Sequence, residues 1–294
     1  GEETIARFHA RLATTTLPPR HVEPVIRLLL ECLNHTLDVS GLLRSVVPEA
    51  YPAETVEVAI TDVLHRTLFG PLDGVNVHAS QGAAPPVLHS DLQMLDLLRQ
   101  DGDVDTDASG NRALTALLKA GRDVFQDRGY HNTRVDDLVA AAGVSHGAFY
   151  RYFRNKDQLA RVLAARAVNS VGAEVIEIPD IEALERPDGK VVLRRWLGRY
   201  HAAHTNEASM LRVWVDAALQ DPSLRAESAP LLDWGRRRMA RWLRPRAFGD
   251  ADMDGVVMVA LLGVFGARQR RAVEIDAAVH VIERGLVGIG LERE

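Results

Sequence analysis

The 294-residue sequence is poor in cysteine and in long apolar runs. Its one cysteine, Cys32, excludes an intrachain disulfide. The longest apolar run extends from Val256 to Ala267, whereas a helix needs about 20 apolar residues to span a bilayer. No basic-then-apolar targeting signal is visible, so we expect a cytoplasmic protein that does not enter the membrane.

The short motifs of common enzyme classes are missing as well. The sequence has no G-x-S-x-G, no H-E-x-x-H, no phosphate-binding loop and no dinucleotide fingerprint. His201 and His204 have the spacing of two metal ligands, as do Cys32 and His35, but no further cluster of Cys, Asp or Glu completes either pair. We therefore expect no enzyme, no metal and no cofactor.

Charge is divided unevenly along the chain, although the formal net charge is only −5. Residues 1–110 hold 7 lysines and arginines against 16 acidic residues, residues 111–161 hold 9 against 5, and residues 162–294 hold 19 against 19. The segment charges are therefore −9, +4 and 0. This asymmetry lets the basic segment approach phosphates, while the acidic remainder disfavours non-specific coating of DNA.

The basic segment has the pattern of two short helices around a tight turn, followed by a third helix. Thr133, with an acidic residue three positions later, predicts an N-cap for a helix over Val135–Ala142. Gly143 permits a left-handed turn, Ser145 can cap a second helix, and Asn155 can cap the third. This layout favours a helix-turn-helix, whose second helix enters the major groove of DNA, although the spacing alone also fits plain helix packing.

Residues 111–165 resemble the DNA-binding domain of the TetR/AcrR family of bacterial repressors. The resemblance rests on Arg128-Gly129-Tyr130, on Ala141-Ala142-Gly143-Val144-Ser145, and on Tyr150-Arg151-Tyr152-Phe153 with Asn155-Lys156. Together with the expected exposed face of the second helix, it implies a set of DNA contacts. These are Thr133, Arg134, Ser145, His146, Gly147, Tyr150, Arg151, Tyr152 and Lys156.

The rest of the sequence predicts an all-α protein, because no alternating strand pattern is present. A long helix is expected over Lys156–Glu177, followed by a polar connection over Asp180–Lys190. Further helices are expected over Val191–Thr205, Glu207–Gln220, Pro222–Arg244, Ala251–Arg271 and Glu274–Gly290. This order resembles a whole TetR subunit, which implies that residues 166–294 form a ligand-binding domain that dimerises through its last two helices.

Residues 1–110 depart from that family pattern, in which the DNA-binding domain normally comes first. Residues 1–70 carry helical patterns over Val22–Leu37 and Ala53–Phe69, and residues 71–110 have the composition of a linker with a short helical pattern over 92–98. Two sets of positions are related by one constant separation of 218 residues (281 − 63), which we call the repeat offset. It relates Val63, Arg66, Leu68 and Gly70 to Val281, Arg284, Leu286 and Gly288, respectively.

From these patterns we expect residues 1–70 to be the end of an earlier regulatory half. The protein then resembles a tandem TetR regulator whose first DNA-binding domain is missing here. In that case the helix over 53–69 packs on the terminal helices of the same chain as an intrachain pseudo-dimer.

Large side chains on the middle helices are candidates for a ligand pocket. Rings with a polar tip suit a small apolar effector such as a lipid or an acyl-CoA, whose phosphates an arginine-rich run over 236–246 could neutralise. The candidates are Trp196, Tyr200, His204, Met210, Trp214 and Trp234. Aromatics at helical spacing also fit an ordinary core, and the arginine run also fits a solvated helix face.

Together these patterns predict a bacterial transcriptional repressor that binds double-stranded operator DNA and is released by an apolar effector. It would act as a homodimer or as an intrachain pseudo-dimer. One alternative is a ligand- or partner-binding protein that keeps the helix-turn-helix as a scaffold. An all-α enzyme is a more distant alternative.

Overall fold

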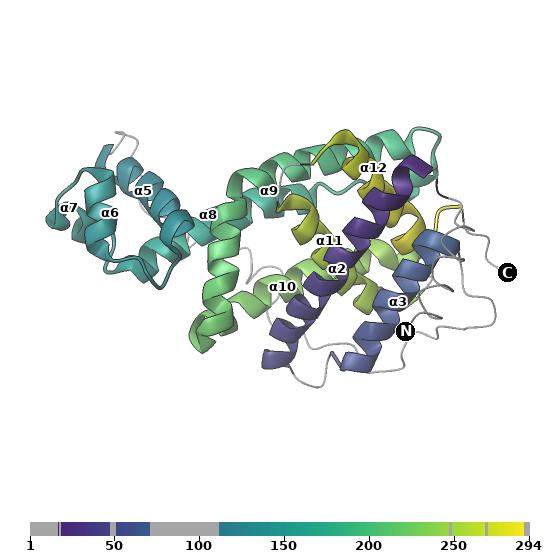
Figure 1. Ribbon diagram of the computed structural model, residues 1–294, viewed down its shortest axis with the longest axis horizontal. Helices are drawn as coiled ribbons and strands as arrows, with labels where there is room; N and C mark the ends of the chain where they lie inside the picture. Colours follow the sequence, from purple (N-terminus) through teal and green to yellow (C-terminus); the bar gives the residue numbers. More distant parts are fainter. Residues whose placement is uncertain are drawn as a thin grey trace. The chain divides into compact units, whose positions relative to one another are not determined.

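The computed structural model describes residues 17, 19–47, 51–70, 112–246, 249–267 and 270–290. All regular structure in these ranges is helical, as the sequence predicted (Figure 1). None of the described helices is long and apolar enough to cross a membrane. The predicted linker over 71–110 and the helical pattern inside it lie outside the described residues.

The chain forms two compact units. Unit 1 comprises residues 1–87, 178–199 and 232–294, and unit 2 comprises residues 88–177 and 200–231. The helices α9 (Gly189–Gln220) and α10 (Pro222–Leu243) contribute residues to both units. The predicted break in α9 at Asn206 is wrong, because α9 is one helix of 32 residues. A single asparagine costs only a few tenths of a kcal/mol in a helix, too little to end it.

Unit 2 contains α5 (Arg112–Arg128), α6 (Val135–Ala142), α7 (His146–Tyr152) and α8 (Lys156–Ile176). Gly121 lets α8 approach α5 closely, because a Cβ there would lie only 2.9 Å from atoms of Leu159. One apolar core joins these helices to the second part of α9. It includes Leu117, Phe125, Leu138, Phe149, Leu163, Met210 and Trp214.

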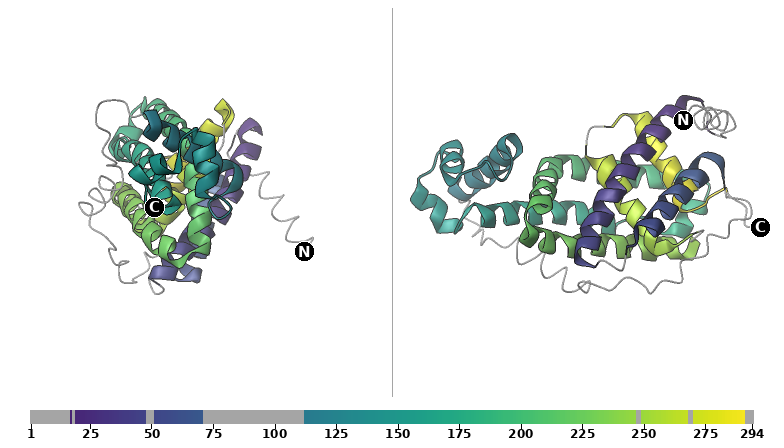
Figure 2. Two further views of the ribbon diagram at one scale, coloured as in Figure 1. Left: turned by 90° about the vertical axis from the view of Figure 1, so that its left-hand side faces the viewer. Right: turned by 60° about the horizontal axis from the view of Figure 1, so that its bottom comes forward.

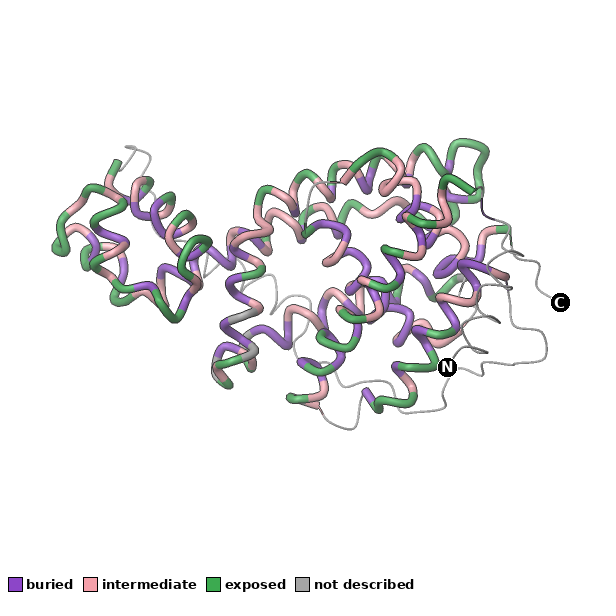
Figure 3. The backbone as a smooth tube through the Cα atoms, viewed as in Figure 1, coloured by how far each residue is buried: buried purple, intermediate pink, exposed green. Residues whose placement is uncertain are grey.

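Unit 1 is built on α2 (Pro19–Val46), α3 (Ala53–Phe69), α11 (Ala251–Gly266), α12 (Ala272–His280) and the π-helical turn η4 (Val281–Leu286). Short 3-10 helices, η2 (Ile181–Glu185) and η3 (Arg244–Arg246), complete it. α2 packs along α11 (Figures 1 and 2), and α3 packs on η4. α11 is buried along nearly its whole length (Figure 3).

Polar contacts tie the N-terminal helices of unit 1 to the C-terminal ones. Cys32 donates its thiol to the Val257 carbonyl at 3.6 Å, and Arg270 donates to Glu31 at 3.1 Å. A Cβ on Gly285 would lie 2.2 Å from the Thr67 hydroxyl oxygen, so η4 can approach α3 only with glycine there. The predicted contact between the helix over 53–69 and the terminal helices is therefore present.

Candidate nucleic-acid interface

The position of α7 is determined by a turn and a cap. Gly143 has φ of +65°, a left-handed conformation in which a Cβ is costly, so the chain turns sharply after α6. The Ser145 hydroxyl then accepts a hydrogen bond from the Ala148 amide at 3.2 Å. Phe149 is fully buried and anchors the helix in the core of unit 2. The predicted turn and the predicted cap at Ser145 are both found.

The opposite face of α7 is open to solvent. Ser145, His146, Gly147 and Arg151 are exposed, and the Tyr150 side chain is 57% exposed although it is a large aromatic. His146 Nε2 lies 2.7 Å from an Asp136 carboxylate oxygen on α6. Tyr152 is half-buried, with the Arg151 guanidinium 6.0 Å from its ring centre. This face offers hydrogen-bond donors and a cation at the surface, as groove contact requires.

The start of α6 differs from the prediction. Arg134, which is exposed, occupies the N-cap position, and its amide donates to Asp137 Oδ2 at 2.9 Å. Thr133 does not cap the helix: its side chain is buried, and its hydroxyl donates backward to the Gly129 carbonyl at 2.7 Å. The sequence pattern placed the cap one residue too early because threonine is the stronger intrinsic capping residue. The buried Thr133 side chain is therefore not available at the surface of the domain.

Lys156 has a role inside the domain that the sequence did not predict. Its ammonium donates to the carbonyls of Tyr130 and Thr133, both at 2.9 Å, and of His131 at 3.4 Å. It also lies 4.7 Å from the centre of the Tyr130 ring. These contacts occupy all three donors of the ammonium, so Lys156 joins the start of α8 to the turn between α5 and α6.

Replacing Lys156 by methionine therefore tests a structural role against a phosphate contact. We expect Lys156→Met to lower the free energy of unfolding by about 1.5–3 kcal/mol, because three carbonyls lose a charged donor. Chemical denaturation followed by circular dichroism measures this. Unchanged stability combined with weakened DNA binding would instead assign Lys156 to a phosphate.

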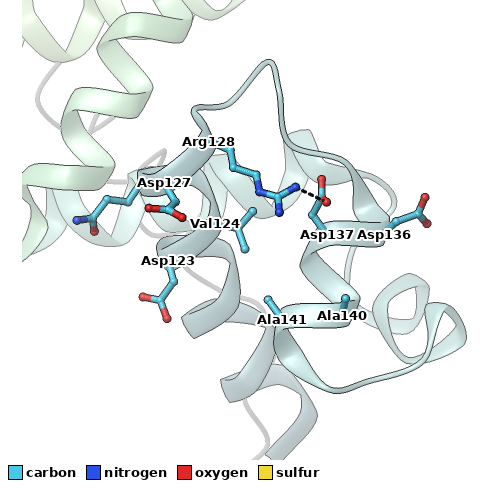
Figure 4. A pocket seen from close by; sticks show the side chains of 9 residues that line it. Asp123, Val124, Asp127, Arg128, Asp136, Asp137, Ala140 and Ala141 are labelled. Carbon is cyan, nitrogen blue, oxygen red and sulfur yellow. Dashed lines mark hydrogen bonds and ion pairs between the residues drawn. The ribbon is translucent and has the colours of Figure 1, made fainter.

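A groove of about 640 Å³ lies between α5 and α6 (Figure 4). Four carboxylates line it, from Asp123, Asp127, Asp136 and Asp137, and the Arg128 guanidinium is 2.6 Å from Asp137. This excess of acidic groups repels phosphates. DNA is therefore expected to meet the domain through α7 and not through this groove.

The six predicted ligand residues are all buried, and none of them lines that groove. Met210 and Trp214 lie in the apolar core of unit 2, which is the alternative interpretation of their spacing. Neither interpretation of the arginine run fits Arg236. Its side chain is buried, and it pairs with Asp233 at 3.0 Å and with Asp252 at 2.5 Å.

A second buried ion cluster was not predicted from the sequence. The Arg66 guanidinium lies 2.9 Å from Asp62 and 3.2 Å from Asp254, with Arg66 and Asp254 both nearly inaccessible. Burial raises the pKa of Asp254 to about 6, although Arg66 opposes the shift. Burial also raises the pKa of Asp62. Arg66 on α3 and Asp254 on α11 are 188 residues apart, and no local pattern could relate them.

An exposed, capped helix that follows a tight turn on a small apolar core defines a helix-turn-helix domain. Residues 117–163 match the family model described as bacterial regulatory proteins, tetR family. Over these residues the helix-turn-helix is therefore similar to that of the tetR family.

Curated relatives are similar to this chain over short stretches. The transcriptional regulator AcuR of Cereibacter sphaeroides is 44% identical over 41 residues, which cover 14% of this chain and 19% of AcuR. The HTH-type transcriptional repressor Rv3405c of Mycobacterium tuberculosis is 34% identical over 93 residues, covering 29% of this chain and 47% of the relative. The chain thus spans less than half the length of either.

One solved structure matches part of the chain. It is a TetR family transcriptional regulator, PfmR from Thermus thermophilus, with a TM-score of 0.46 and 22% sequence identity. The match covers 60% of this chain and 99% of PfmR.

Proposed function

We propose that this protein is a transcriptional repressor that reads operator DNA through α7. The observation that carries the proposal is the exposed face of α7, in which Tyr150 and Arg151 point away from a core that holds Phe149. The charge of +4 on residues 111–161 supports it, because neutralising phosphates provides most of the affinity for DNA. The relatives' names, regulator and repressor, support a role in transcription and give no support to an enzyme.

Arg151→Ala tests the DNA-binding face, and Lys119→Ala is its matched control. Both residues are exposed cations on unit 2, but Lys119 lies on α5 and pairs with Asp123 at 3.4 Å. We expect Arg151→Ala to weaken operator binding by about tenfold and to reduce the salt slope by about one. Lys119→Ala should leave both unchanged. Fluorescence anisotropy over a salt series measures these values, and equal effects of the two variants would favour the scaffold alternative.

We further propose that α2 and α3 take the place of the dimer partner of α11 and α12, as in a tandem regulator. Each N-terminal helix packs on its proposed equivalent: α2 contacts α11, and α3 contacts η4. In addition, α2 contacts α12, and α3 contacts α11. This is the contact pattern of an isologous, two-fold interface. The repeat offset supports the same relation, because it also relates Thr67 to Gly285, and these two residues contact each other as equivalent residues on a two-fold axis must.

Two glycines that the repeat offset relates both have a positive φ, which supports the equivalence of α3 and the C-terminal helices. Gly70, at the end of α3, has φ of +96°, and Gly288, just after η4, has φ of +76°. The repeat offset relates these two positions as well. A tandem regulator of this kind would present two reading helices to one operator without needing a second chain.

We propose that a small apolar effector, such as a lipid or an acyl-CoA, releases the operator. The continuous core of unit 2 supports a coupling route, because it joins Phe149 of α7 to Met210 and Trp214 of α9. The ion pair between Arg122 of α5 and Glu207 of α9, at 3.3 Å, adds a polar link. A shift of α9 could therefore move α7 as well.

Reciprocity provides the test of the effector. A ligand that weakens operator binding about tenfold must itself bind about tenfold more weakly to the operator complex than to the unbound protein. Isothermal titration of lipids and acyl-CoAs into both forms measures the two affinities. Equal affinities for the two forms would exclude the titrated compound as an effector.

A further inference from the structure

The helices α2 and α3 have a solvent-exposed face that carries Leu37, Gly41 and Val58. We call it the outer face of α2 and α3. Leu37 is 46% exposed and Val58 is 52% exposed, although both are large apolar residues. A Cβ on Gly41 would meet no atom within 4 Å. This face is therefore open, and two large apolar side chains are exposed on it.

The repeat offset assigns an equivalent to each of these three positions, and all three equivalents are packed. They are Gly255 for Leu37, Val259 for Gly41 and Asp276 for Val58. Gly255 lies against α10 so closely that a Cβ would be 2.7 Å from a backbone carbonyl of that helix. A Val259 methyl group is in contact distance of the Cβ position of Gly235 in α10, at 3.5 Å. Asp276 forms an ion pair with Arg194 in α9. The same face of α11 and α12 is thus covered by α9 and α10.

Other equivalent pairs show the same difference in burial. Thr61 of α3 is exposed, whereas Val279 of α12 is completely buried. Asp38 of α2 is exposed, whereas Val256 of α11 is buried. The outer face of α2 and α3 therefore lacks, among the described residues, the helical layer that its equivalent possesses.

We propose that the outer face of α2 and α3 is the docking surface for a helix pair equivalent to α9 and α10, located before α2 in the same polypeptide. The order of elements supports this occupant, because α9 and α10 directly precede α11. A second copy of this chain cannot supply its α9 and α10 as this layer, because its own α11 and α12 already cover them. The inference rests on the proposed pairing of α2 and α3 with α11 and η4.

Cysteine labelling tests the occupant. Leu37→Cys and Val58→Cys place thiols on the outer face, and Val191→Cys, which replaces a 58% exposed residue of α9 in the same unit, is the control. Cys32 does not interfere, because it is buried and burial raises the pKa of its thiol to about 12. Each variant is labelled with a maleimide in two forms, the 294-residue chain and the complete gene product.

In the 294-residue chain, we expect all three thiols to react at similar rates. In the complete gene product, the thiols at positions 37 and 58 should react at least about tenfold more slowly than the thiol at 191. Equal rates in the complete product, or a product with no helix pair before α2, would overturn the proposal. Protection that already exists in the 294-residue chain, or that rises with its concentration, would also overturn it. Operator affinity of the same variants reports separately on the proposed repressor function, and the Arg66 variant discussed below reports on the pairing.

Discussion

Arg66→Met should cost about 3–5 kcal/mol of unfolding free energy at pH 8, because it removes the cation that Asp62 and Asp254 share. Arg284→Met is the matched control. It replaces the arginine that the repeat offset relates to Arg66, for which the described residues provide no ion pair. The control should lose clearly less. Similar losses in both variants would contradict a special role for the Arg66 cluster.

The stability that Arg66→Met loses should depend on pH. The pKa of Asp254 in the folded protein is about 6, above its value in the unfolded chain, so the folded state binds the extra proton as the pH falls. Burying the charged carboxylate therefore costs most above pH 6, and the cost declines toward pH 4. Without Arg66 the pKa should rise further. We expect the deficit of Arg66→Met to be smaller at pH 5 than at pH 8.

The double variant Arg66→Met with Asp254→Leu separates the ion pair from its surroundings. Replacing both members of a buried pair by apolar residues is often nearly neutral, whereas removing one leaves an uncompensated charge. We therefore expect the double variant to recover the part of the stability loss that arises from Asp254, whereas Asp62 stays without its arginine. Such recovery would identify Arg66 and Asp254 as a pairing device between α3 and α11 rather than a net source of stability.

Phe149→Ala and Tyr150→Ala, on adjacent residues, should fail in different ways. Phe149 is fully buried, and its removal should cost about 3–5 kcal/mol of unfolding free energy and abolish operator binding through loss of the folded domain. Tyr150 is exposed, so its removal should change stability by less than about 0.5 kcal/mol. It should nevertheless weaken operator binding by about tenfold.

Thermal unfolding and anisotropy titration, made on the same preparations, distinguish the two variants. If Tyr150→Ala kept full operator affinity, the exposed face of α7 would not be the reading surface. If it destabilised the domain as much as Phe149→Ala, the tyrosine would belong to the core.

Local signals predicted the elements well. Pro52 and Gly70 bracket α3, and its predicted bounds agree with those found. Gly143, Ser145 and Asn155 supplied the turn and the caps of the helix-turn-helix. Each of these features depends on a few neighbouring residues, which a sequence displays directly.

Features that depend on tertiary neighbours were not predictable in the same way. The structural role of Lys156 was not predicted, because the turn that accepts its ammonium lies far back along the chain, between α5 and α6. Arg236 looked like part of a solvated or ligand-binding run, because its carboxylate partner Asp252 is on another helix. The last predicted helix changes from α to π at Val281, and we find no sequence signal for that change.

Binding of the intact protein to the DNA upstream of its own gene, followed over a series of salt concentrations, tests the central claim most directly. The account predicts an affinity at least about 1,000-fold greater than for an unrelated duplex of the same length, falling steeply as salt rises. Equal affinity for the two duplexes, or binding that does not respond to salt, would contradict a repressor that reads its operator through α7.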